Sequence, residues 1–199
     1  MSQTEVQLIK SSSVVDADIV GMSSSKLSGA LPAISGASLT NLPSSGISDS
    51  DQWRITTTVI SNSLFLTSNW ERVDSGGYGL LGTGMTESSG VFTFPSTGIY
   101  RIDFQAAGYR GTADSIRFVN AYIMTTTDNS SYSEASYGVT NIHNATNCYG
   151  SMTISHQFDV TNVSTHKVKF KVESENDLIW MGNSGTTQTG AVFTRLGDT

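Results

Sequence analysis

The feature that most constrains the fold of this chain is a strict alternation of apolar and polar residues in several short runs. The longest run, residues 152–160, is apolar at every second position except His156, which shares the same phase. Successive side chains of a strand point to opposite sides of a sheet, so this period of two predicts strands with one buried face. Shorter runs of the same kind surround Phe92, Ile102 and Phe170. No segment has a helical period over about ten residues.

The composition indicates the same fold class. Charged residues make up 14% of the 199 residues, below the roughly 25% usual in soluble proteins. The polar surface must therefore come from Ser, Thr, Asn and Gly, which favour strands, turns and loops. Turn-forming clusters, such as residues 74–77 and 96–98, separate about eight to ten short strand-like runs. We predict an all-β sandwich head over residues 51–199.

The chain has a different character before this head. Residues 11–51 are rich in Ser, Gly and Ala and contain no aromatic residue, yet an apolar residue recurs every few positions. A disordered linker is one interpretation. The regular spacing favours another, an extended, non-globular stem over residues 21–50 that buries its apolar side chains against copies of itself. The expected contacts within a trimeric stem are Leu27, Leu31, Ile34, Leu39 and Leu42.

Residues 1–20 precede this stem, and the only apolar cluster within residues 1–10 is formed by Val6, Leu8 and Ile9. We interpret this segment as a short peptide that docks the chain to another protein. A frayed terminus is the alternative.

Charge and cysteine content exclude several partner classes from our expectations. The net charge is −6, and the eleven Lys and Arg residues are spread along the chain, whereas phosphate binding needs clustered cations. Lys167, Lys169 and Lys171 alternate with apolar residues and are interpreted as the solvent-facing side of a strand. Cys148 is the single cysteine, so no intramolecular disulfide can form. Because of this charge distribution, we expect no nucleic-acid binding. No apolar run approaches the roughly 20 residues needed to span a bilayer, so we expect no membrane insertion.

Two motifs in the head resemble a known family. Residues 90–102, GVFTFPSTGIYRI, and residues 190–197, GAVFTRLG, are similar to the central signature and the last strand of globular heads in the complement and tumour-necrosis-factor superfamily. In this resemblance Phe92 and Phe94 point into the sandwich, and Gly98 allows the turn before Tyr100. The resemblance implies a ten-strand jelly roll and a tight homotrimer.

The stem has a resemblance of its own. Residues 16–21, DADIVG, and residues 26–42, KLSGALPAISGASLTNL, look like the low-complexity stretches of phage tail fibres, particularly those of marine phages. The resemblance implies a virion protein made in the host cytoplasm and placed at the tail, with its N-terminus docked to a tail or other virion protein. A capsid decoration protein, a trimer with an extended arm on the head shell, is the alternative.

Catalytic and cofactor motifs are weak. Residues 77–82, GYGLLG, satisfy the dinucleotide pattern, but no helix is expected after them to receive a pyrophosphate, so we expect a glycine loop between strands and no cofactor. The three histidines, His143, His156 and His166, are far apart in sequence, and we expect no metal site. The acidic candidates Glu71, Asp74, Glu87 and Asp103 select no catalytic pair, and we expect no enzyme.

Residues 125–150 are the best candidate for recognition. The segment combines tyrosines with Ser, Asn, Thr and Gly, a mixture typical of adaptable binding loops. The expected partner is a host cell-surface molecule, a glycan among the candidates. Coverage of sheet edges or of the trimer interface is the alternative role of these side chains. The predicted receptor-binding residues are Tyr132, Tyr137, His143 and Tyr149.

Overall fold

The computed structural model describes residues 46–111 and 116–199. They belong to one compact unit, Ser44–Thr199. The predicted docking peptide and most of the predicted stem lie outside the described residues. The same holds for the individual residues predicted there: Val6, Leu8, Ile9, Leu27, Leu31, Ile34, Leu39 and Leu42.

Every regular element of the described residues is a strand, so the all-β prediction is confirmed. No helix among them is long and apolar enough to cross a membrane. The strands are β1 (Ser50–Ile55), β2 (Thr57–Phe65), β3 (Trp70–Arg72), β4 (Thr86–Ser88), β5 (Val91–Thr93), β6 (Gly98–Tyr109), β7 (Val119–Thr126), β8 (Ser133–Thr140), β9 (Tyr149–Val160), β10 (Lys167–Asn183) and β11 (Gly190–Gly197).

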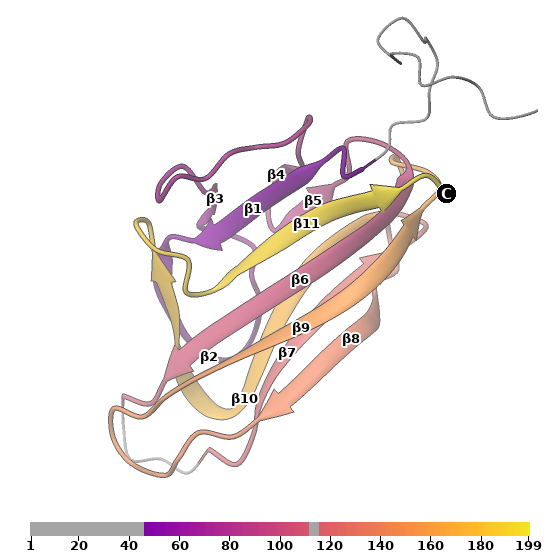
Figure 1. Ribbon diagram of the computed structural model, residues 1–199. Coiled ribbons are helices and arrows are strands. Elements are labelled where there is room, and N and C mark those ends of the chain that lie inside the picture. Colours follow the sequence, from indigo (N-terminus) through magenta and orange to yellow (C-terminus); the bar gives the residue numbers. More distant parts are fainter. Residues whose placement is uncertain (1–45, 112–115) are drawn as a thin grey trace, which may run out of the picture. The chain divides into compact units, whose positions relative to one another are not determined.

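The strands form a jelly-roll sandwich of two layers (Figure 1). One layer has the order β3-β1-β11-β6-β9, and the other has β4 next to β5 and then β10, β7 and β8. β10 is long enough to pair with β7 through its first half and with β2 through both halves. Near its end β10 also pairs with β6, where Ile179 lies opposite Tyr109 and Trp180 opposite Gly108. This last pairing joins the layers into one hydrogen-bonded sheet.

The core lies between the layers and is rich in aromatic rings. Phe92, Phe104 and Phe170 are completely buried, and Phe193 is 1% exposed. Phe104 stacks on Phe170 with ring centres 4.5 Å apart, and Phe92 meets Phe193 at 5.1 Å. These rings come from both layers, so the alternating pattern of the sequence correctly predicts which side of each strand is buried.

Residues 90–102, which resemble the central signature of the tumour-necrosis-factor (TNF) superfamily, have the structure that the resemblance implies. Phe92 and Phe94 are buried in the core, and the Tyr100 hydroxyl bonds to the Ser96 backbone oxygen at 3.1 Å. Gly98 has a φ of +144°, and an added Cβ there would crowd the guanidinium of Arg195 at 2.5 Å from its Nε. Only glycine fits this position, because of both its backbone conformation and its close neighbour.

The structure divides one β-branched and aromatic run of the sequence into two strands. Residues 53–60 look like a single strand in the sequence, but β1 pairs with β11 in one layer whereas β2 pairs with β10 in the other. The chain crosses between layers at Thr56, whose N–H donates to the Asn69 carbonyl at 2.9 Å instead of joining either ladder. The described residues therefore contain eleven strands, where the resemblance implied ten.

Candidate functional site

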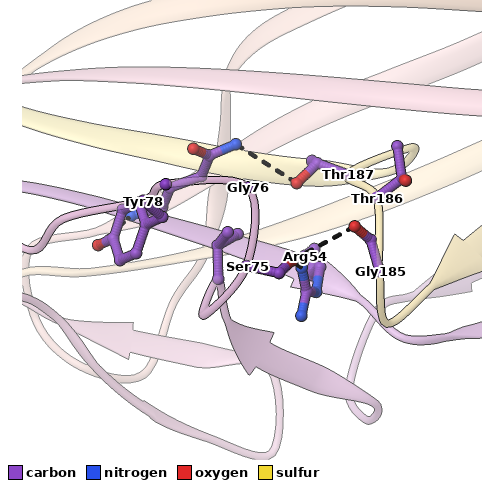
Figure 2. A pocket seen from close by; sticks show the side chains of 10 residues that line it. Arg54, Ser75, Gly76, Tyr78, Gly185, Thr186 and Thr187 are labelled. Atoms are coloured by element: carbon purple, nitrogen blue, oxygen red, sulfur yellow. Dashed lines mark hydrogen bonds between the residues drawn. The ribbon is translucent and has the colours of Figure 1, made fainter.

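An open cleft lies beside β1. It lies between the loop that follows β3 and the loop that joins β10 to β11, and its volume is about 420 Å³. Figure 2 shows Tyr78 and Ser75 on one side and Gly185, Thr186 and Thr187 on the other. Such a volume falls within the range of small-molecule sites in proteins. The lining residues are Gln52, Arg54, Val73, Ser75, Gly76, Gly77, Tyr78, Gly185, Thr186 and Thr187.

Arg54 forms the charged floor of the cleft. Its side chain is only 1% exposed, and Nε pairs with Glu71 at 3.0 Å while Nη2 pairs with Asp74 at 2.6 Å. Nη1 donates to the Ser75 hydroxyl at 2.7 Å. Each nitrogen of the guanidinium thus has a partner. Removing those partners would leave a buried, uncompensated charge, which is strongly destabilising.

A second buried charge, Asp51, positions the tyrosine wall. This carboxylate is 1% exposed and accepts the Tyr78 hydroxyl at 2.7 Å, the Arg72 Nε at 3.0 Å and the Met85 N–H at 2.7 Å. Burial, together with the bond to the Asp51 carboxylate, raises the pKa of Tyr78 to about 12. The hydroxyl therefore stays protonated and points inward, while the ring lines the cleft.

The opposite wall is held by hydrogen bonds at both ends of its loop. Asn183 Oδ1 accepts the N–H groups of Gly185 and Thr186, at 2.7 and 3.0 Å. At the other end the buried Thr189 bonds through Oγ1 to the Ala107 N–H at 3.2 Å. The wall is therefore preformed rather than assembled on binding.

Two weaker bonds join the walls across the cleft. The Gln52 amide Nε2 donates to Thr187 Oγ1 at 3.4 Å, and the Ser75 hydroxyl donates to the Gly185 carbonyl at 3.3 Å. Both are long for hydrogen bonds of their type. A ligand that offers shorter bonds can replace them at little expense.

Two of the four predicted recognition residues lie together, on the outer side of β7, β8 and β10. Tyr137 is 63% exposed and stacks on Tyr122 with ring centres 5.9 Å apart. Tyr132 covers Lys169, whose Nζ lies 3.9 Å from the Tyr132 ring centre and 4.1 Å from that of Phe65. This surface therefore has an exposed aromatic platform beside a cation.

The lysines of β10 are less solvated than the sequence suggested. Lys167 is only 9% exposed, and Nζ donates to Thr93 Oγ1 at 3.0 Å and to the Val163 carbonyl at 2.7 Å. Burial lowers the pKa of both Lys167 and Lys169. The expectation of a solvent-facing row is wrong for Lys167, because side chains from neighbouring segments cover this side of the strand.

The other two predicted residues, His143 and Tyr149, belong to a different neighbourhood. Tyr149 is 64% exposed and stacks on Tyr109 with ring centres 4.9 Å apart. His143 lies in the loop before β9, where the buried Arg110 donates from Nη1 to its carbonyl at 3.2 Å. Its Nδ1 lies 4.0 Å from the thiol of Cys148. The structure thus separates the four residues into two pairs, and their role in recognition stays a prediction.

Comparison with solved structures identifies the fold that this chain shares with known proteins. No family model matches the sequence, and no curated protein matches it. Among solved structures, murine APRIL at pH 5.0 has a TM-score of 0.52 at 12% identity over 74% of this chain and 98% of APRIL. Murine APRIL at pH 8.5 has 0.53 at 13% over the same shares. Eiger TNF from S. frugiperda has 0.55 at 9% over 75% and 93%. The chain carries a TNF-like jelly roll. At these identities the likeness extends to the fold alone.

Residues 77–82, which match the dinucleotide pattern in sequence, form part of a loop between two strands. This loop joins β3 to β4, and Thr83 and the residues up to β4 form no helix. The predicted glycine loop between strands is therefore present. Its first glycine, together with Gly76, forms part of the cleft wall.

No local pattern of the sequence predicts the cleft, because its walls come from segments more than a hundred positions apart. One signal was available. Arg54 stands alone as a charged residue within an otherwise β-branched and aromatic run, and a buried arginine needs acidic partners. Glu71 and Asp74 are those partners, so the two carboxylates that selected no catalytic pair are brought together on one guanidinium.

Proposed function

We propose that this chain is a virion fibre protein of a phage, whose TNF-like head forms a homotrimer and binds the host surface. Residues 1–20 dock it to the tail, and residues 21–50 form a three-chain stem. The order of these parts and the two resemblances in the sequence support this assignment. Weak binding sites on three heads, multiplied over several fibres, would give avidity that one head lacks.

One observation in the described residues carries the proposal of a trimer. The outer sides of β6 and β9 present Gln105, Ala107 and Tyr109 next to Ser151 and Thr153, a stretch without any charged side chain. Depletion of charge and enrichment of tyrosine are typical of the centre of a protein interface.

The charges at the edge of this surface are compensated. Arg101 pairs with Asp103 at 2.9 Å, and Asp103 also accepts the hydroxyl of Ser155. Charges that are already paired at the rim of an interface oppose the approach of a partner only weakly, and they help to set its orientation. The surface is thus suited to a second copy of the chain.

The oligomeric state is tested by native mass spectrometry of the full chain, for which we expect a trimer. Replacing the exposed Thr153 by arginine should lower the temperature at which the trimer dissociates, because a charge would enter the interface. The matched control is Thr67→Arg, an exposed threonine in the loop between β2 and β3. A monomeric wild-type chain would contradict the trimer, and equal effects of both substitutions would contradict an interface through β6 and β9.

The placement is tested by gold labelling of intact virions with an antibody against residues 52–199. Label at the tail supports the fibre, and deletion of residues 1–20 should then abolish incorporation while a folded oligomer remains. Label spread over the capsid at hundreds of copies would replace the fibre by the decoration protein. Incorporation of the shortened chain would refute the docking role of the N-terminus.

A further inference from the structure

We propose that the cleft over Arg54 is a binding site for an uncharged saccharide. This inference deepens the proposed recognition of the host surface, and it assigns that role to a site distinct from the predicted tyrosines. It rests on the charge balance of the floor, on the groups left free along the walls and on the open backbone of the glycine turn.

The charge balance of the floor disfavours anionic ligands. The guanidinium of Arg54 is shared between Glu71 and Asp74, so the three groups together carry one net negative charge. The third side of the guanidinium is occupied by the Ser75 hydroxyl. A carboxylate or phosphate would have to displace one of these partners and would meet the repulsion of the other. A neutral ligand meets neither obstacle.

The groups left free along the walls match the hydroxyls of a sugar. Among the described residues, none donates a hydrogen bond to Gln52 Oε1, and none bonds to the side-chain hydroxyl of Thr186. The Thr187 hydroxyl is held only by the long bond from Gln52. An amide and two hydroxyls offer donors and acceptors in a small volume, which suits a ligand that carries both on neighbouring atoms.

Tyr78 supplies the apolar part of the site. Its hydroxyl is committed to Asp51, so a ligand meets the ring rather than the phenol. The ring is held from behind, because the Gln52 N–H also donates to its oxygen at 3.1 Å. A fixed aromatic ring provides large contact area at low conformational-entropy expense, and it suits the apolar side of a sugar ring.

The glycine turn leaves backbone open to the ligand. Gly76 and Gly77 have φ values of +70° and +80°, and a Cβ added at either would meet no other atom within 4 Å. The space beside both glycines is therefore unfilled. Without side chains there, a ligand can approach the peptide groups themselves.

The test uses the full-chain protein and saturation-transfer NMR with glucose, galactose, mannose, rhamnose and N-acetylglucosamine, with glucuronate as the anionic comparison. We expect saturation transfer to at least one neutral sugar and a weaker response from glucuronate. Thr186→Trp should fill the cleft and weaken binding by at least about tenfold. The variant should still fold, because the Thr186 side chain makes no hydrogen bond that the fold needs. Ser184→Trp, in the same loop but outside the lining, should bind as the wild type does.

The outcomes separate this inference from the proposed function. No transfer to any neutral sugar, a stronger response from glucuronate, or equal binding by the Thr186→Trp variant would overturn the saccharide site. Binding of labelled protein to host cells is measured in parallel. Host binding that persists in the Thr186→Trp variant keeps the receptor function and removes the cleft from it. Sugar binding without host binding keeps the site and removes the receptor function.

Discussion

The hydroxyl of Tyr78 donates a 2.7 Å hydrogen bond to the buried carboxylate of Asp51, 27 positions earlier in the chain. Trp53 Nε1 donates to the same carboxylate at 2.8 Å. The carboxylate of Asp51 in β1 therefore connects the core residue Trp53 with Tyr78 in the loop that lines the cleft. The geometry of the cleft depends on a residue that does not line it.

Replacing Asp51 by asparagine should lower the free energy of unfolding by about 3 kcal/mol. The amide cannot accept all the donors that converge on the carboxylate, and its NH2 group would face some of them. Tyr78→Phe should lower it by less, about 2 kcal/mol, because the hydrogen bond to Asp51 and the one from the Gln52 N–H are both lost. Denaturant unfolding at one fixed protein concentration measures both. Equal effects would show that the bond to Tyr78 accounts for the whole contribution of Asp51.

Gly90 and Gly79 should respond oppositely to alanine. Gly90 has a φ of +78°, and a Cβ there would overlap the carbonyl oxygen of Leu66, so we expect a loss of about 2 to 4 kcal/mol. At Gly79 a Cβ would meet nothing within 4 Å, and stability should stay the same or rise slightly. Thermal unfolding of the two variants side by side checks this. A Gly90→Ala variant as stable as the wild type would refute the tight turn before β5.

Phe170 should be the more sensitive of two phenylalanines on neighbouring strands. It is fully buried against Phe104, so Phe170→Ala should lower the free energy of unfolding by about 3 to 5 kcal/mol. Phe65 is 38% exposed on the outer side, and Phe65→Ala should lower it by about 1 kcal/mol or less. Denaturant titration of both variants tests whether the core lies between the layers. The reverse order would place it elsewhere.

His156 should make the head less stable in mild acid. Burial lowers its pKa, so below the unfolded value of about 6.5 the unfolded chain takes up the proton more readily than the folded one. Stability is therefore fully present above that value and falls as the pH drops toward the lowered folded pKa.

The comparison variant for this prediction is His156→Gln. Between about pH 7.5 and pH 5.5 its melting temperature should fall less than that of the wild type. The carboxylates contribute equally to both proteins, so the difference between the two isolates the histidine. Parallel melting curves across this range would rule the histidine out as the cause.

Much of the fold followed from local pattern. The alternation around Phe92, Ile102 and Phe170 correctly predicts the buried side of each strand, because a pleated strand leaves no other arrangement. The break at Thr56 was not predictable in this way. Both halves of that run have strand-forming residues, and only their pairing with different partners separates them.

The candidate site followed from the sequence only in part. Aromatic and amide composition singled out Tyr132, Tyr137 and Tyr149, and the structure places Tyr137 and Tyr149 in exposed, stacked positions. Composition could not show that they lie in two separate neighbourhoods. That outcome depends on which strands pair and on which side of each strand a residue falls.

The fold class, the glycine turns and the buried sides of the strands could be predicted from the sequence, because these depend on residues close together in the chain. The tertiary structure alone decided the cleft. Its floor pairs Arg54 with Asp74, and its far wall places Thr187 against Gln52, 135 positions away. Such contacts arise from the order of strands in the sheets, and no local period encodes that order.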